Sequence, residues 1–153
     1  MEPHHYPFKS NGLYEFTFTS IGPKGKIRKK VWYEFDHDKG MYLELRFGDD
    51  VGFDKPDVDA ISDNSDRDVV LRTVALTVVV MLKRFPELAV RGTGSNEARV
   101  RLYHILIGKH HNKISAIVSV HGKRKNRWSP FKRGVRYTEF QATLKCYEKK
   151  YET

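Results

Sequence analysis

The chain has 153 residues, 39% of them hydrophobic, and a formal net charge of +9. This length and apolar content predict a single domain over residues 1–153 with a packed core, and they exclude a disordered chain. The longest apolar run, Val74 to Leu82, is far shorter than the roughly 20 residues that cross a bilayer. Because the one cysteine, Cys146, cannot form an internal disulfide and the N-terminus lacks the apolar stretch of an export signal, we expect a cytoplasmic protein that binds no membrane.

The charges are distributed unevenly along the sequence. Residues 49–68 hold eight Asp against Lys55 and Arg67, a net charge of −6, whereas residues 91–153 hold fifteen Lys or Arg against four acids, a net charge of +11. This asymmetry favours a polyanionic partner, or a protein partner that binds in one orientation. A basic surface that is only solvated is the alternative.

The N-terminal third predicts a loose arm followed by a three-stranded meander. Residues 1–11 are polar and contain two prolines, which is typical of an arm. Apolar and polar residues then alternate in Leu13–Ser20, Ile27–Phe35 and Met41–Phe47, and turn-forming residues separate these segments. Three consecutive antiparallel strands are the simplest interpretation.

The next segment predicts an acidic loop and a long buried helix. The loop from Gly48 to Ser65 is rich in aspartate, but it lacks the glycine and glutamate of an EF-hand, so we expect no metal. Ser65, with Asp68 three residues later, resembles a capping box and predicts the helix start. Apolar residues on one wide face up to Arg84 predict that this helix packs on the sheet.

The C-terminal half predicts a second helix and the remaining strands. The pattern favours, in chain order, a strand at 88–92, a helix at 95–108, a turn at 108–113, a strand at 114–121, a basic loop at 122–128, a helical turn at 137–140 and a strand at 142–147. The predicted class is therefore α+β, a mainly antiparallel sheet begun by the meander, with two helices packed on one face.

The entry to the second helix has the composition of an anion site. A glycine-containing turn precedes Ser95, an expected N-cap, so free amides and the positive end of the helix dipole point the same way. The expected anion-binding residues are Gly94, Ser95, Asn96, Arg99 and Arg101. Arg99 is nearer the first turn and is expected to be exposed. A capped helix whose glycines serve only steric needs is the alternative.

Basic residues near aromatic ones predict a surface for single-stranded nucleic acid, where cations contact phosphates and rings stack on bases. The expected nucleic-acid-binding residues are Lys24, Lys26, Arg28, Lys123, Arg124, Lys125, Arg127, Trp128, Lys132 and Arg133. Two alternatives stay open: lysines on an edge strand also prevent aggregation, and Trp128 can anchor its loop in the core.

An enzymatic interpretation rests on three residues. His104, Tyr103 and His121 could serve proton transfer in a small, toxin-like, metal-independent ribonuclease, with arginine stabilising the phosphorane charge. Tyr103 and His104 also follow a helical core stripe, which favours a structural role. We find no motif for a metal or an organic cofactor and expect none.

Four motifs together resemble a small bacterial domain family of unknown function. They are Phe16–Gly25, Phe47–Asp49, Ser62–Asp66 ahead of Thr73–Ala75, and Gly94–Tyr103. Family members usually show Gly-Ser-Thr-x-x-Arg-Thr-Arg-Leu-Tyr, so Asn96 and Val100 are departures. The resemblance implies a domain extent from about Tyr14 to Phe140 and no activity.

The sequence thus favours a binding module for a phosphate-bearing polyanion, RNA or DNA. A small ribonuclease and a protein-binding module without a nucleic-acid role are the alternatives.

Overall fold

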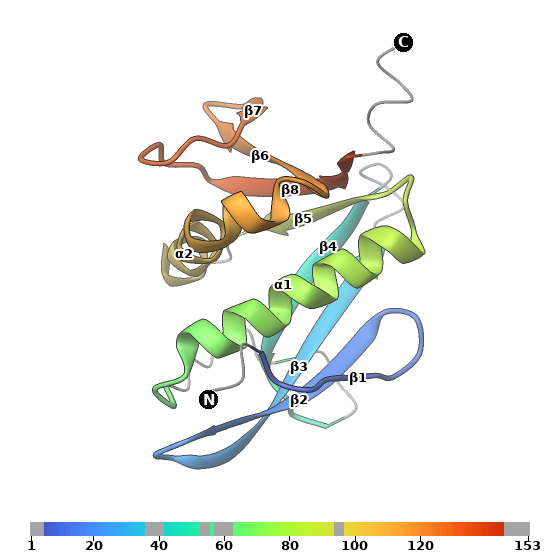
Figure 1. Cartoon of the computed structure of the whole chain (residues 1–153), viewed down its shortest axis with the longest axis vertical. Coiled ribbons are helices and arrows are strands. Elements are labelled where there is room, and N and C mark those ends of the chain that lie inside the picture. The colour runs from blue at the N-terminus through green and yellow to red at the C-terminus, as the bar shows by residue number, and fades with distance from the viewer. Residues whose placement is uncertain (1–4, 36–41, 53–55, 57–62, 94–96, 146–153) are drawn as a thin grey trace. The chain divides into compact units, whose positions relative to one another are not determined.

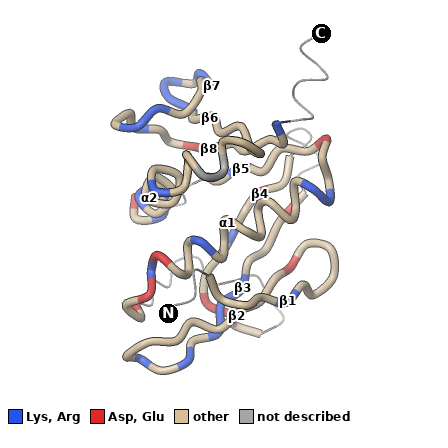
Figure 2. The backbone as a smooth tube through the Cα atoms, viewed as in Figure 1, with Lys and Arg blue, Asp and Glu red and all other residues tan. Residues whose placement is uncertain are grey.

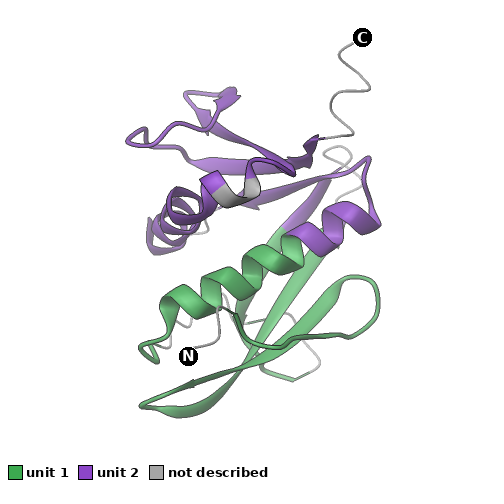
Figure 3. Ribbon diagram, viewed as in Figure 1, with its two compact units in different colours: residues 1–34, 45–78 green, residues 35–44, 79–153 purple. Residues whose placement is uncertain are grey.

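The computed structural model describes residues 5–35, 42–52, 56, 63–93 and 97–145 (Figure 1). The chain divides into two compact units (Figure 3). Unit 1 comprises residues 1–34 and 45–78, and unit 2 comprises residues 35–44 and 79–153. The single domain expected from the sequence stays a prediction.

The strands form one eight-stranded sheet in the order β1-β2-β3-β4-β5-β8-β6-β7. The elements are β1 (Lys9–Ser10), β2 (Glu15–Gly22), β3 (Gly25–Phe35), β4 (Tyr42–Asp49), α1 (Arg67–Arg84), β5 (Ala89–Thr93), α2 (Glu97–Ile114), β6 (Val118–Arg124), β7 (Arg127–Pro130) and β8 (Glu139–Leu144). The β4–β5 pair is parallel, and β1–β2, β2–β3, β5–β8, β8–β6 and β6–β7 are antiparallel. The predicted α+β class, with a meander at its start, is confirmed.

Unit 1 has an aromatic core between its strands and α1. Phe16 and Val31 face each other across β2 and β3 and are fully buried. The ring of Tyr33 meets Phe16 edge-on, and its hydroxyl lies 2.8 Å from the Thr77 Oγ1 of α1. This buried hydroxyl pair links α1 to the strands, and Thr77 Oγ1 also donates to the Val74 carbonyl of its own helix at 2.7 Å.

The N-terminal segment differs from the loose arm expected for residues 1–11. Tyr6 is only 7% exposed, and its backbone N–H donates to Thr73 Oγ1 of α1 at 2.9 Å. Lys9 and Ser10 pair with β2 as a short strand. The pattern missed this anchoring because a single buried ring between prolines produces no periodicity.

Helix α1 begins one residue later than expected, so the prediction that Ser65 is its N-cap is wrong. Ser65 has a φ of +62°, and the first helical residue is Arg67, which places Asp66 at the cap position. The Asp66 carboxylate accepts hydrogen bonds of 2.5 Å from the hydroxyls of Tyr6 and Ser20. Burial, followed by this carboxylate, raises the pKa of Tyr6, so its hydroxyl stays protonated and keeps donating.

Unit 2 places α2 on one face of its strands. Gly92 of β5 lies under the Tyr103 ring, where an added Cβ would be 3.2 Å from Tyr103 Cζ. Phe140 of β8 also contacts this face of α2, through the rings of Tyr103 and His104. Since side chains alternate along a strand, the neighbouring residues Arg91 and Gln141 lie on the opposite face.

Several expected boundaries in unit 2 are wrong, and the strand expected at 114–121 begins only at Val118. Residues 108–113, expected as a turn, continue α2 to Ile114, and His110 is buried on this added stretch of the helix. Residues 122–128, expected as a basic loop, form most of the β6–β7 hairpin. Residues 137–140, expected as a helical turn, lead into β8, whose register with β5 and β6 fixes them as extended chain.

Candidate nucleic-acid interface

Lys and Arg residues gather along the β6–β7 hairpin (Figure 2). Arg124 and Arg127 pair across the two strands, and only Lys125 and Asn126 join them. The φ angles of the joining residues are 51° and 62°, the positive values of a type I′ turn. The three basic side chains are all exposed. The hairpin therefore projects its charge beyond the body of unit 2.

Lys125 occupies a left-handed backbone conformation that costs a residue with a side chain roughly 1–2 kcal/mol. We expect Lys125→Gly to raise the free energy of unfolding by about 0.5–1 kcal/mol. Glycine adopts positive φ without this cost, but it also increases the conformational entropy of the unfolded chain, which offsets part of the gain. Urea unfolding measures the change, and Lys24→Gly at an exposed position without positive φ is the control. A destabilised Lys125→Gly variant would contradict the observed turn.

The segment after β7 is fixed to the rest of unit 2. Tyr137 is buried, and its hydroxyl accepts the Lys132 backbone N–H at 2.9 Å. Arg133 donates from Nη2 to the Gly108 carbonyl of α2 at 2.6 Å. Phe131 is 8% exposed and packs on Tyr137, so neither ring is available for base stacking. Lys132 remains exposed and adds its charge to the hairpin surface.

Trp128 lies half-buried at the junction between the hairpin and the sheet face. Its ring is 5.0 Å from the Arg91 guanidinium and 5.8 Å from Lys123 Nζ. Lys123 also pairs with Glu139 at 3.1 Å, so its charge is partly neutralised. Trp128 therefore contacts two cations of the chain itself. Its expected role in stacking on a nucleic-acid base stays a prediction that binding measurements test.

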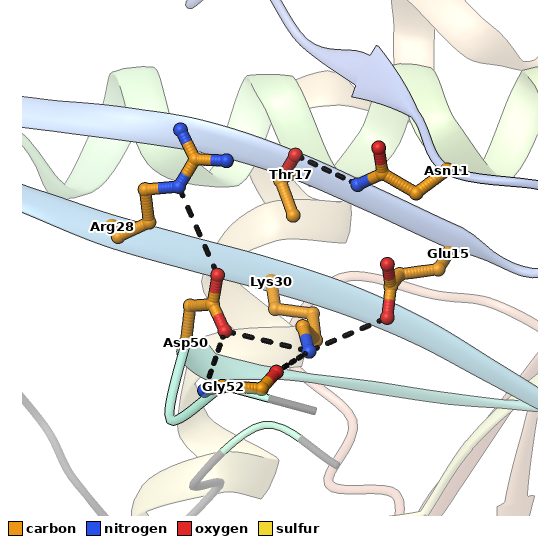
Figure 4. Close-up of polar contacts among 7 residues, drawn as sticks. All are labelled: Asn11, Glu15, Thr17, Arg28, Lys30, Asp50 and Gly52. Carbon is orange, nitrogen blue, oxygen red and sulfur yellow. Dashed lines mark hydrogen bonds and ion pairs between the residues drawn. The ribbon is translucent and has the colours of Figure 1, made fainter. Parts of the chain in front are cut away.

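The basic hairpin of unit 1 has two different sides. Lys24 and Lys26 are exposed, and the Arg28 side chain is 60% exposed, with Asp50 at 3.8 Å. Lys30 points inward, where its Nζ lies 3.3 Å from Glu15, 3.4 Å from Asp50 and 2.5 Å from the Gly52 carbonyl (Figure 4). Part of the basic run is thus an internal ion-pair network.

The expected anion site at the start of α2 is only partly visible. Gly94, Ser95 and Asn96 lie outside the described residues. Arg101 is exposed, whereas Arg99 is only 5% exposed, so the expectation of an exposed Arg99 that closes the site is wrong. Arg99 belongs to the packed interior of unit 2, because the helix turns its side chain inward.

The three residues considered for catalysis do not converge. Tyr103 is 3% exposed and packs in the core. His104 accepts the Tyr137 backbone N–H at 3.2 Å through Nε2, which is a structural role. His121 pairs with Gln141 across β6 and β8, on the sheet face opposite α2. The sheet therefore separates His121 from the other two.

Two further findings concern metal ligands and membrane-spanning helices. Within the described residues, no group of three or more His, Cys, Asp or Glu is placed to hold a metal ion. Asp57 and Asp59 of the acidic loop lie outside those residues. Neither described helix combines the length and apolar character needed to cross a membrane.

Sequence reasoning missed the residues that surround Arg91. The Arg91 guanidinium lies 4.2 Å from the Tyr42 ring, and its Nε donates to Gln141 Oε1 at 2.9 Å. A charged residue between the buried Val90 and Gly92 of a strand was the available signal. Its partners could not be found in this way, because they are about 50 residues away on other strands.

A family model for a family of unknown function, DUF6934, matches residues 2–145. The chain belongs to this family. The match spans both units and all the described strands and helices, which agrees with the resemblance to a small family of unknown function. No curated protein and no solved structure matches the chain.

Proposed function

We propose that the chain binds single-stranded RNA or DNA through the basic surface of unit 2. This surface consists of Arg124, Lys125, Arg127 and Lys132, all of which are exposed. From Gly122 to Thr138 the sequence holds seven basic residues and no acidic one. The observation that carries the proposal is the two-residue hairpin, which concentrates three exposed cations at one tip.

The physical basis is counterion release. A single strand carries a dense row of phosphates, and each phosphate that a Lys or Arg neutralises releases a condensed cation. The hairpin tip presents long, flexible cationic side chains that reach a backbone without needing a defined base sequence. The proposal therefore predicts binding that is tolerant of sequence and steeply dependent on salt.

The test compares two triple variants with the same net charge. Arg124→Ala/Lys125→Ala/Arg127→Ala removes the tip, and Lys9→Ala/Arg67→Ala/Lys83→Ala removes three exposed cations elsewhere. Fluorescence anisotropy with labelled single strands of mixed sequence, over a range of salt concentrations, gives the slope of log K against log salt. We expect the tip variant to flatten the slope by up to about 2 units, at about 0.7 for each phosphate that the protein no longer neutralises. The control variant should keep the wild-type slope.

Equal slopes for a folded tip variant and the wild type would remove the hairpin from the interface. Loss of binding in both variants would point to net charge alone. Cleavage of the RNA strand in EDTA would instead favour a ribonuclease, for which the described residues show no converging catalytic group. Absence of any binding by the wild type would leave a protein partner as the remaining class.

A further inference from the structure

The face of the unit 2 strands that lies opposite α2 is lined by polar side chains in register. Glu44 of β4, Arg91 of β5, Gln141 of β8 and His121 of β6 are direct neighbours across four adjacent strands. All four are only half-buried. Apolar side chains are expected on a strand face that packs as core, so this row is a polar surface.

Arg91 is held in this surface from three directions. The Tyr42 ring lies 4.2 Å from its guanidinium carbon, the Trp128 ring lies 5.0 Å away, and Nε donates to Gln141 Oε1 at 2.9 Å. Cation-π contacts with two rings restrict the position of the guanidinium, and the Nε hydrogen bond restricts its rotation. The side chain therefore loses little further freedom when it binds a ligand.

The two terminal amino groups of Arg91 have no hydrogen-bond partner in the described part of the chain. A guanidinium whose Nε is already bonded still offers two parallel N–H donors on its terminal nitrogens. This fork matches two oxygens of one phosphate or carboxylate group, and a lysine ammonium does not reproduce that geometry.

Two more polar atoms near Gln141 are unsatisfied within the described residues. His121 Nδ1 and Thr143 Oγ1 are buried as atoms and have no hydrogen-bond partner there. His121 is the cross-strand neighbour of Gln141, and Thr143 lies two residues further on the same face of β8. A buried polar atom without a partner costs about 1–3 kcal/mol, so a ligand that satisfies such atoms gains affinity.

The carboxylates on this face are engaged by their own neighbours. Glu44 Oε1 accepts the Thr93 hydroxyl at 2.7 Å, and Glu139 pairs with Lys123 at 3.1 Å. Neither is within ion-pair distance of Arg91 among the contacts of the described chain. The guanidinium therefore remains the cation of this face with donors available to an incoming anion.

We propose that Arg91 binds a phosphodiester group of the single strand that the hairpin holds, with the strand passing from the hairpin tip onto the polar face. Trp128 connects the two places, because it belongs to β7 of the hairpin and also makes a cation-π contact with Arg91. This inference rests on the proposed function and adds a defined phosphate contact to it. The hairpin contributes positive charge without a fixed geometry, and Arg91 contributes two N–H donors in a defined orientation.

The deciding variant is Arg91→Lys, which keeps the charge and removes the fork. We expect affinity for a labelled single strand to fall about tenfold, the loss typical of a hydrogen bond to a charged group, while the salt slope stays at the wild-type value. Arg67→Lys, at an exposed position of unit 1, is the matched control and should bind as the wild type does. A folded Arg91→Lys variant with wild-type affinity overturns the inference and leaves the hairpin proposal standing.

A second measurement uses the unmodified protein. The Arg91 Nε–Hε resonance, assigned by its absence in Arg91→Lys, should shift when a short oligonucleotide is added, and inorganic phosphate should shift it in the same direction at higher concentration. If the wild type binds no oligonucleotide, the proposed function fails. A phosphate-induced shift would then still support an anion site at Arg91, and its absence would overturn that site as well.

Discussion

Replacing Gly22 with alanine is expected to lower the free energy of unfolding by more than about 3 kcal/mol. An added Cβ would lie 1.9 Å from the Asn64 carbonyl oxygen and 2.8 Å from Asn64 Cγ. A backbone oxygen cannot rotate away as the end of a flexible side chain can. The β2–β3 hairpin and the loop before α1 would therefore have to separate.

Asn64 cannot move away from the new Cβ, because it is buried and its side chain is held by hydrogen bonds. It is 1% exposed, and its Nδ2 donates to the Gly25 carbonyl at 2.9 Å and to Ser20 Oγ at 3.1 Å. Its Oδ1 accepts the Lys24 N–H at 2.7 Å. Displacing Asn64 would break these three bonds together, and this is why the expected effect exceeds that of ordinary overpacking.

Urea unfolding followed by circular dichroism measures the effect of Gly22→Ala. Gly108→Ala is the control, because an added Cβ in the middle of α2 meets nothing within 4 Å. That change should be neutral or stabilising by up to about 1 kcal/mol, since alanine favours the helix. Equal stabilities of the Gly22 and Gly108 variants would mean that the hairpin does not approach Asn64 as described.

Gly122→Ala is expected to cost about 3 kcal/mol and to disturb the proposed interface as well. The new Cβ would lie 2.3 Å from Cγ and Cδ1 of Tyr137. The Tyr137 ring is 3% exposed, and its hydroxyl and backbone N–H bond to the Lys132 N–H and His104 Nε2. Moving the ring would release the segment between β7 and β8, together with the exposed Lys132.

A double-mutant cycle separates this clash from other effects of the substitution. In a Tyr137→Ala background the ring is absent, so Gly122→Ala should cost less than about 1 kcal/mol. The coupling between the two positions should then be about 2 kcal/mol or more. Additive effects would show that Gly122 is needed for a reason other than the approach of Tyr137, such as its backbone freedom in β6.

The sequence by itself determined the elements whose residues repeat with a regular period. Alternation from Leu13 to Phe47 predicted the meander of β2, β3 and β4. The Ser65–Asp68 pattern and the apolar face before Arg84 predicted α1 to within one residue of its start. These signals are local, because burial of one face imposes period two on a strand and period 3.6 on a helix. The charge asymmetry, which is read directly from the order of charged residues along the chain, was equally accessible.

Only the tertiary structure decided where individual side chains act. Asp66 replaced Ser65 at the start of α1 because two hydroxyls from distant segments hold its carboxylate. Lys125 and Asn126 formed a hairpin turn without glycine. The pairing of β6 with β8 fixes the strand that leads into the turn, so the turn residues adopt positive φ despite its cost.

The same holds for the arginines. Arg99 and Arg91 are both charged residues of unit 2, yet one is buried and the other presents its terminal amino groups on a polar face. What distinguishes them is the set of neighbours, and for Arg91 these come from β4, β7 and β8. The periodicity of apolar residues in the sequence shows which side chains face the core. The partners that hold a functional group are brought together only when the strands pair.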